Sequence, residues 1–129
     1  MGSGANHSGL IHRASKVPVA DTADRLEVVL RAKGFKIFAR IDQKAEAEAV
    51  GMTMRPMQLV IFGDPRTGTP LMNTYPSIGI DLPLKVLVWE DREGRVWLSY
   101  TDPVYLRTRH GLPETPFKAL GALVDQVFA

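Results

Sequence analysis

The chain has 129 residues, which is enough for one domain with a hydrophobic core and too few for two. Hydrophobic residues make up 45% and charged residues 23%, which is typical of a folded globular protein and excludes a disordered chain. The absence of cysteine excludes disulfides, thiolate zinc sites and cysteine nucleophiles, and the net charge of +2 arises from interspersed charges that do not favour nucleic-acid binding.

The start of the chain contains neither a secretory signal nor an apolar run. No segment approaches the roughly 18 apolar residues of a membrane span, so we expect a cytoplasmic protein with no membrane partner. Residues 1–12 are expected to form a flexible segment that could derive from an expression tag, and residues 13–129 to form a single domain.

The first half of the chain alternates strands with helices. Strands are predicted near residues 9–15, 35–41 and 57–62, the last being apolar enough for the interior of a sheet. Asp21 or Thr22 can cap the first helix, which ends before Gly34, and Asp42 can cap a short helix over residues 44–50.

The second half contains a hairpin flanked by short helices. Residues 84–89 and 96–100 predict two antiparallel strands, joined by residues 91–94 with glycine at the left-handed position. Helices are predicted after Thr69-Pro70, where Pro76 shortens or bends the helix, from Asp102-Pro103 to His110, and from Thr115-Pro116 onward. This irregular alternation predicts an α+β fold, an antiparallel β-sheet with helices packed on one face.

The segment Gly63–Pro70, GDPRTGTP, is the first candidate for a binding site. Left-handed dihedrals at Gly63 and Gly68 would point successive amide N–H groups into one concavity. A helix beginning at Thr69 would add its positive end, so an anion could lie over residues 66–69. The segment lacks the lysine of a Walker A loop, and a plain strand-to-helix turn is the alternative interpretation. The candidate ligand-binding residues are Gly63, Asp64, Arg66, Thr67, Gly68, Thr69 and His110.

Three titratable side chains are candidates for acid–base chemistry. Asp81 lies between apolar residues just before a strand, where burial would raise the pKa of its carboxyl group. His110 ends a predicted helix, where it could transfer protons or interact with the helix dipole. Asp64 is the third candidate, and capping is the alternative role for Asp81 and His110. Three histidines without metal-ligand spacing predict no metal site and no cofactor.

The order and spacing of these motifs resemble the DUF302 family of small bacterial and archaeal domains. The resemblance rests on QLVIFGDPRTGTPLM and GIDLPLKVLVWEDREGRVWLSYTDPVYLRTRHGL and spans roughly Asp21 to Leu112. It implies an antiparallel sheet covered by helices, similar to the TATA-box-binding-protein class of folds, and a homodimer. It implies no reaction and no DNA binding, because similar folds carry unrelated functions. The matching positions are Phe62, Gly63, Asp64, Pro65, Gly68, Pro70, Leu71, Met72, Asp81, Leu82, Pro83, Trp89, Asp102, Pro103 and His110.

We therefore expect a homodimeric binding module that holds a small anionic or polar ligand at the segment Gly63–Pro70. One alternative is an enzyme in which Asp64 or Asp81 works with His110 as an acid–base pair. Another is a protein-interaction module that uses the hairpin with Trp89 and Trp97. Nucleic acid is not an expected partner.

Overall fold

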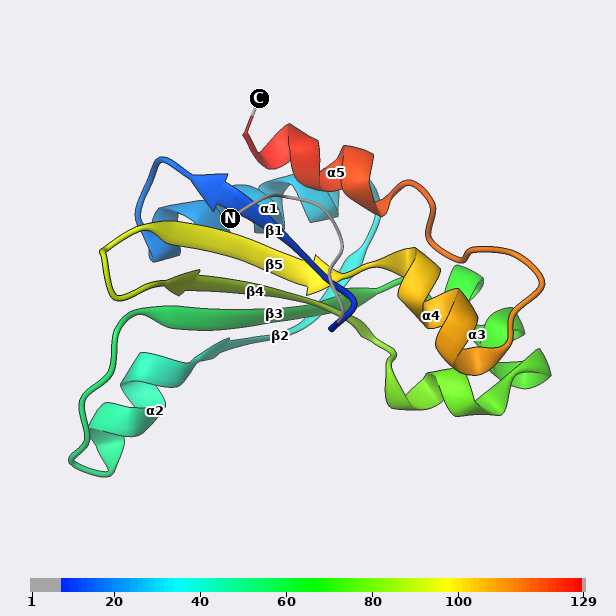
Figure 1. The fold of residues 1–129 in the computed structure, drawn as a ribbon, viewed down its shortest axis with the longest axis horizontal. Helices are drawn as coiled ribbons and strands as arrows, with labels where there is room; N and C mark the ends of the chain where they lie inside the picture. Colours follow the sequence, from blue (N-terminus) through cyan, green and yellow to red (C-terminus); the bar gives the residue numbers. More distant parts are fainter. Residues whose placement is uncertain (1–7, 129) are drawn as a thin grey trace.

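A computed structural model describes residues 8–128 and contains a five-stranded antiparallel sheet in the order β1-β5-β4-β3-β2 (Figure 1). The strands are β1 (Leu10–Ser15), β2 (Lys36–Asp42), β3 (Met57–Gly63), β4 (Leu84–Glu90) and β5 (Val96–Thr101). The predicted α+β class and the antiparallel hairpin of β4 and β5 are confirmed.

The helices surround this sheet unevenly (Figure 1). They are α1 (Val19–Ala32), α2 (Gln43–Ala49), α3 (Pro65–Thr74), α4 (Pro103–His110) and α5 (Leu120–Val127), with a 3₁₀-helix η1 at Pro76–Ile80. The helices α1 and α5 cover one face of the sheet, whereas α3, η1 and α4 gather at the end where β3 and β5 finish. None of the helices in the described residues has the length and apolar character needed to span a bilayer.

The core lies between the sheet and α1 and α5. Its fully buried side chains come from β3, β4, β5 and the two helices: Val60, Phe62, Val86, Val88, Leu98, Leu26, Leu30 and Val124. Each such side chain contributes about 1.5–3 kcal/mol through removal of apolar surface from water. In each strand, the residues between these buried ones point to the opposite face of the sheet.

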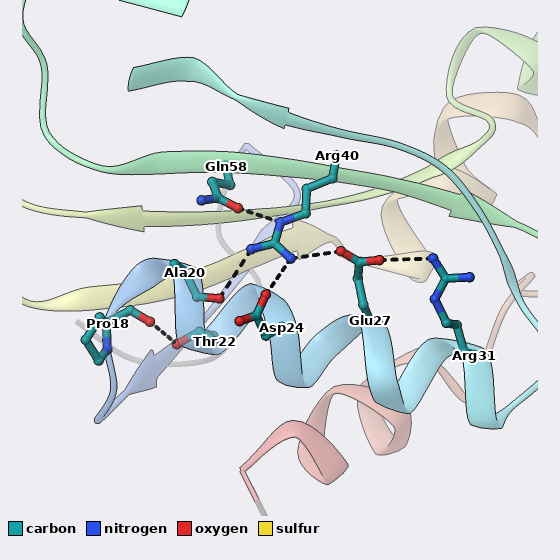
Figure 2. Close-up of polar contacts among 8 residues, drawn as sticks. All are labelled: Pro18, Ala20, Thr22, Asp24, Glu27, Arg31, Arg40 and Gln58. Carbon is teal, nitrogen blue, oxygen red and sulfur yellow. Dashed lines mark hydrogen bonds and ion pairs between the residues drawn. The ribbon is translucent and has the colours of Figure 1, made fainter. Parts of the chain in front are cut away.

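A polar network fastens α1 to the sheet (Figure 2). From β2, Arg40 donates hydrogen bonds to Asp24 at 2.7 Å, to Glu27 at 2.8 Å and to the side chain of Gln58 at 2.6 Å. The hydrogen bond from Arg40 lowers the pKa of Glu27, and Arg31 donates a further hydrogen bond to that carboxylate at 3.2 Å. Glu27 is therefore held in its ionised form between two guanidinium groups.

Two predicted boundaries at the start of the chain are wrong. Helix α1 begins at Val19 after Pro18, not at a cap formed by Asp21 or Thr22. Thr22 is buried in the first turn, where its hydroxyl donates to the Pro18 carbonyl at 3.0 Å and so serves the helix from inside. Strand β1 begins at Leu10, so residues 10–12 are paired with β5 and do not belong to a flexible segment. The expectations for residues 1–7 lie outside the described residues.

The last helix also begins later than predicted. Its first residue is Leu120, not a position near Thr115-Pro116, because Phe117 has a φ angle of 54°. A bulky residue with positive φ cannot continue a right-handed helix. Two other predicted caps are confirmed: the Asp42 carboxylate accepts from the Ala45 amide and that of Asp102 accepts from the Val104 amide.

Candidate functional site

The segment predicted to be a loop is the beginning of α3. Asp64 is the N-cap, and its side chain accepts a hydrogen bond from the Arg66 amide at 3.0 Å. The amides of Thr67 and Gly68 donate to the Asp64 carbonyl at 3.0 and 2.9 Å. The first helical residue is Pro65, which needs no N–H partner there, so the predicted start at Thr69-Pro70 is wrong.

The predicted amide cradle is therefore not formed. Gly63 and Gly68 are not among the glycines with positive φ, and the amides of residues 66–68 are already paired within the cap and the first turn. The Asp64 carboxylate occupies the positive end of the helix dipole, which is the position that a bound anion would need. A helix that caps itself with a carboxylate does not attract a second negative charge.

A cavity of about 180 Å³ lies beside this helix start. We call the lining residues from the segment Gly63–Pro70 its base: Gly63, Asp64, Pro65, Gly68 and Thr69. Its walls are apolar: Met72 comes from the same helix, and Phe38, residues 82–84 and Phe117 come from three other parts of the chain. The segment Gly63–Pro70 therefore borders a mainly apolar cavity, whose polar lining residues lie at its base.

The two glycines of the motif allow neighbouring groups to approach this cavity closely. A Cβ atom on Gly63 would lie 3.3 Å from the Phe38 ring, tighter than almost all real contacts. A Cβ atom on Gly68 would meet Met72 at 3.7 Å and Leu82 at 3.9 Å, which is ordinary contact distance. A side chain on Gly63 would thus require Phe38 to move by a few tenths of an ångström, whereas a methyl group on Gly68 would make ordinary contacts.

Two aromatic residues reach the cavity through irregular backbone. A register shift between Ile37 and Ala39 interrupts the pairing of β2 with β3 and turns Phe38 outward, where it is 45% exposed. Phe117 lines the cavity from its positive-φ position in the segment before α5. Backbone strain of this kind costs about 1–3 kcal/mol and is concentrated at functional sites.

The charge at the base of the cavity is carried by Asp64. Arg66 donates side-chain hydrogen bonds to both carboxylate oxygens, at 3.1 Å and 3.3 Å, and these bonds lower the pKa of Asp64. Asp64 is therefore an ionised acceptor at neutral pH. Arg66 itself is 81% exposed and lies on the outer side of the helix start. A hydroxyl or ammonium group entering the cavity would find an acceptor in this carboxylate.

A second polar cluster joins η1 to the end of α4. His110 Nε2 lies 2.5 Å from Asp81 Oδ2, and His110 Nδ1 lies 2.8 Å from the Ser77 hydroxyl. The His110 side chain is only 4% exposed, and Arg109 lies 3.6 Å from the other Asp81 oxygen. Both ring nitrogens of His110 therefore have partners.

The predicted site residues separate into two groups. Gly63, Asp64, Gly68 and Thr69 line the cavity, whereas Arg66, Thr67 and His110 do not. The structure brings Asp81 to His110 but pairs Asp64 with Arg66 instead. Within residues 8–128, no three His, Cys, Asp or Glu side chains gather into a group that could hold a metal ion.

Sequence reasoning missed Phe38, Leu84, Phe117 and Ser77 as site residues, and it named Met72, Leu82 and Pro83 only as positions that match the family. Phe38 gave a usable signal, because in residues 35–41 it stands on the side of the strand that carries Lys36 and Arg40. A phenylalanine among charged residues at a strand irregularity predicts an exposed ring. Phe117 gave a misleading signal, since its spacing fits the apolar face of α5. Ser77 gave none, because its relation to His110 is purely tertiary.

Comparison with known proteins identifies the family. The family model "Domain of unknown function DUF302" matches residues 11–128, so the chain belongs to this family. A solved structure described as an uncharacterized conserved DUF302 protein from Bacillus stearothermophilus has a TM-score of 0.72 at 19% identity, covering 93% of this chain and 88% of that one. This likeness shows the shared fold.

Curated relatives carry a more specific name. The chain is 40% identical over 117 residues to "Fluoride-specific ion channel FluC 1" of Brucella suis biovar 1 (strain 1330), which covers 91% of this chain and 46% of that protein. The match to "Fluoride-specific ion channel FluC 2" of Brucella melitensis biotype 1 is also 40% identical and covers 43% of that protein. The chain thus spans less than half the length of these relatives.

Proposed function

We propose that this DUF302 domain is a homodimeric binding module that holds a small molecule in the cavity beside the start of α3. The observation that carries the proposal is that residues of the family signature and a residue with strained backbone line the same cavity. Gly63, Asp64 and Gly68 form the base of that space, and Phe117 lines it from a positive-φ position. Phe117 also packs against the hydrophobic core, and the cavity is where this strained residue and the motif meet.

The size and lining of the cavity indicate the class of ligand. Its volume of about 180 Å³ is slightly larger than that of an apolar cavity of roughly 150 Å³ that admits benzene. Phe38, Leu82 and Phe117 offer contacts to a ring, and Asp64 offers one anionic acceptor. We therefore propose a neutral or cationic single-ring molecule with one hydrogen-bond donor, in place of the anionic ligand expected from the sequence.

The proposal is tested by thermal shift with three matched single-ring probes: benzyl alcohol, benzylamine and benzoate. A ligand present at about a hundred times its dissociation constant adds roughly 2.7 kcal/mol to the free energy of unfolding. Benzyl alcohol and benzylamine should raise the melting temperature, and benzoate should not, because its carboxylate would face Asp64. Stabilisation by benzoate alone would overturn the proposed polarity.

The matched control is Gly68→Leu, which places a side chain in the cavity from a helical position where the added Cβ atom makes only ordinary contacts. It should fold and should not respond to benzyl alcohol or benzylamine. A response equal to that of the wild type would place binding elsewhere. Because curated relatives are named fluoride channels, the thermal shift is also measured in sodium fluoride, with sodium chloride as the control. A shift specific to fluoride would replace the ring-ligand proposal.

We place the interface of the proposed homodimer on the sheet face opposite α1 and α5. By alternation with the buried residues of β3 and β4, this face carries Leu59, Ile61, Leu87 and Trp89, which are all only half-buried. Apolar surface of this kind, bordered here by Lys85 opposite Ile61, is typical of protein interfaces. Light scattering should give twice the mass of the chain, and Leu87→Lys should give a folded monomer. A monomeric wild type at all concentrations would contradict this assembly. The cytoplasmic location expected from the sequence stays a prediction.

A further inference from the structure

The side chains of Ser77, His110 and Asp81 form a hydrogen-bonded cluster. Ligand binding at the cavity does not explain their arrangement. Its three side chains come from η1, the residue that follows η1, and the last residue of α4. None of the three lines the cavity beside α3, so this cluster is separate from the proposed ligand site. Its two internal hydrogen bonds, of 2.5 Å and 2.8 Å, lie on opposite nitrogens of one imidazole.

The carboxylate determines which ring nitrogen carries the proton. An ionised Asp81 only accepts hydrogen bonds, so His110 Nε2 is the donor across the 2.5 Å contact. In a neutral imidazole the other nitrogen then has a free lone pair. His110 Nδ1 therefore accepts the Ser77 hydroxyl proton at 2.8 Å. A hydroxyl, a base and a group that orients the base are the three components of an activated nucleophile.

Burial divides this cluster into a reactive end and a supporting end. The His110 side chain is 4% exposed and that of Asp81 is 23% exposed, whereas Ser77 lies on the surface. The low exposure of His110 shields most of its ring from bulk water, so its proton exchange takes place beside the Ser77 hydroxyl. The chain contains a useful contrast in Ser99, whose hydroxyl also contacts a histidine, His12, at 2.6 Å. Ser99 is 4% exposed and additionally accepts from Trp89, so no substrate can reach it.

We propose that Ser77, His110 and Asp81 form an acyl-transfer site that acts on small activated esters. Ser77 Oγ adds to the acyl carbon while its proton passes to His110 Nδ1, and the bond from that carbon to the alcohol oxygen breaks. The departing alcohol takes the proton from His110. Water then adds to the acyl group and gives a proton to Nδ1, and Ser77 leaves with that proton as the free hydroxyl. Asp81 is a positioning residue throughout, because it holds the imidazole in one tautomer.

The first test is covalent labelling of the wild-type protein with diisopropyl fluorophosphate, followed by intact mass and peptide mapping. The label should be on Ser77, and p-nitrophenyl acetate should show a burst of one acetyl group per chain. General-base assistance contributes about 10²–10⁴-fold, so His110→Ala should slow labelling at least about 100-fold. Thr74→Ala, which removes another exposed hydroxyl nearby, should label like the wild type. Label on a residue other than Ser77, or equal labelling of Ser77→Ala, would overturn the site.

The second test remains valid if the cluster also stabilises the fold. Because the chain has no cysteine, Ser77→Cys introduces the only thiol. Its alkylation by iodoacetamide should be at least 10-fold faster than that of Thr74→Cys, because His110 removes the thiol proton. Adding Asp81→Asn should lower the rate toward that of Thr74→Cys in protein whose circular dichroism is unchanged. Equal rates for the two thiols would show that the cluster is a structural tether. These outcomes do not depend on ligand binding at the cavity.

Discussion

Replacement of Gly68 by alanine should stabilise the protein and weaken ligand binding at the same time. Gly68 is buried in the first turns of α3 and has no positive φ, so alanine fits its backbone. The added methyl group would meet Met72 and Leu82 at 3.7 and 3.9 Å, without a clash. Alanine is favoured over glycine within a helix by about 0.8–1 kcal/mol. For a domain of this length that gain corresponds to a rise in melting temperature of about 3–4 °C.

Circular dichroism melts of Gly68→Ala measure the stability, and calorimetric titration with benzyl alcohol measures the affinity. The affinity should fall several-fold, because the methyl group occupies part of the cavity. The matched control is Thr67→Ala, on the exposed side of the same helix and outside this cavity, which should keep the affinity of the wild type. Destabilisation of Gly68→Ala would refute the packing argument, and an unchanged affinity would refute the location of the ligand.

Three further predictions concern the fold. Glu27→Gln should cost about 0.5–1 kcal/mol at pH 7, measured by urea unfolding. Because Arg40 lowers the Glu27 pKa from 4.5, that contribution should be complete above pH 4.5 and lost as the pH falls through the folded value, so a cost that persists at pH 2 would contradict it. Asp102→Ala should cost about 0.5–2 kcal/mol by the same method through loss of the Val104 cap, and Asn should largely restore it. Phe62→Ala should cost about 3–5 kcal/mol in urea, and a cost below 1 kcal/mol would contradict its full burial.

Local sequence signals predicted most of the fold correctly. The alternation over residues 35–41, the apolar run of β3 and the hairpin around Gly94 each specify a strand through nearest neighbours. The caps Asp42 and Asp102 were recognisable because they act within three residues of their own position. Such interactions are encoded in short segments, so a single sequence reveals them.

The errors arose where two local signals competed. Asp64-Pro65 and Thr69-Pro70 both have the form of a cap followed by proline, and the structure uses the first pair. Pro70 is tolerated inside α3, so proline alone did not locate the start of the helix. Phe117 has helical spacing, yet it has a positive φ and packs against the core and the cavity. Packing between distant segments cannot be predicted from the spacing of apolar residues.

The candidate sites were predicted only in part for the same reason. Gly63, Asp64 and Gly68 were identified from composition, but the apolar walls that define the ligand come from distant segments. Asp81 and His110 were considered as a pair on chemical grounds alone. Their contact, and the addition of Ser77, depend on how η1 packs beside α4.

The most direct test of the proposed function is a ¹⁵N–¹H NMR titration of the wild-type protein with benzyl alcohol. The binding module predicts saturable shifts confined to the amides of Phe38 and of the non-proline residues of 63–72, 82–84 and 117, with Gly68 and Phe117 among the largest. The same titration of Gly68→Leu should show no saturable shifts. Shifts on the exposed face of β3 and β4, or no saturable shifts in the wild type, would contradict a ligand site at the start of α3.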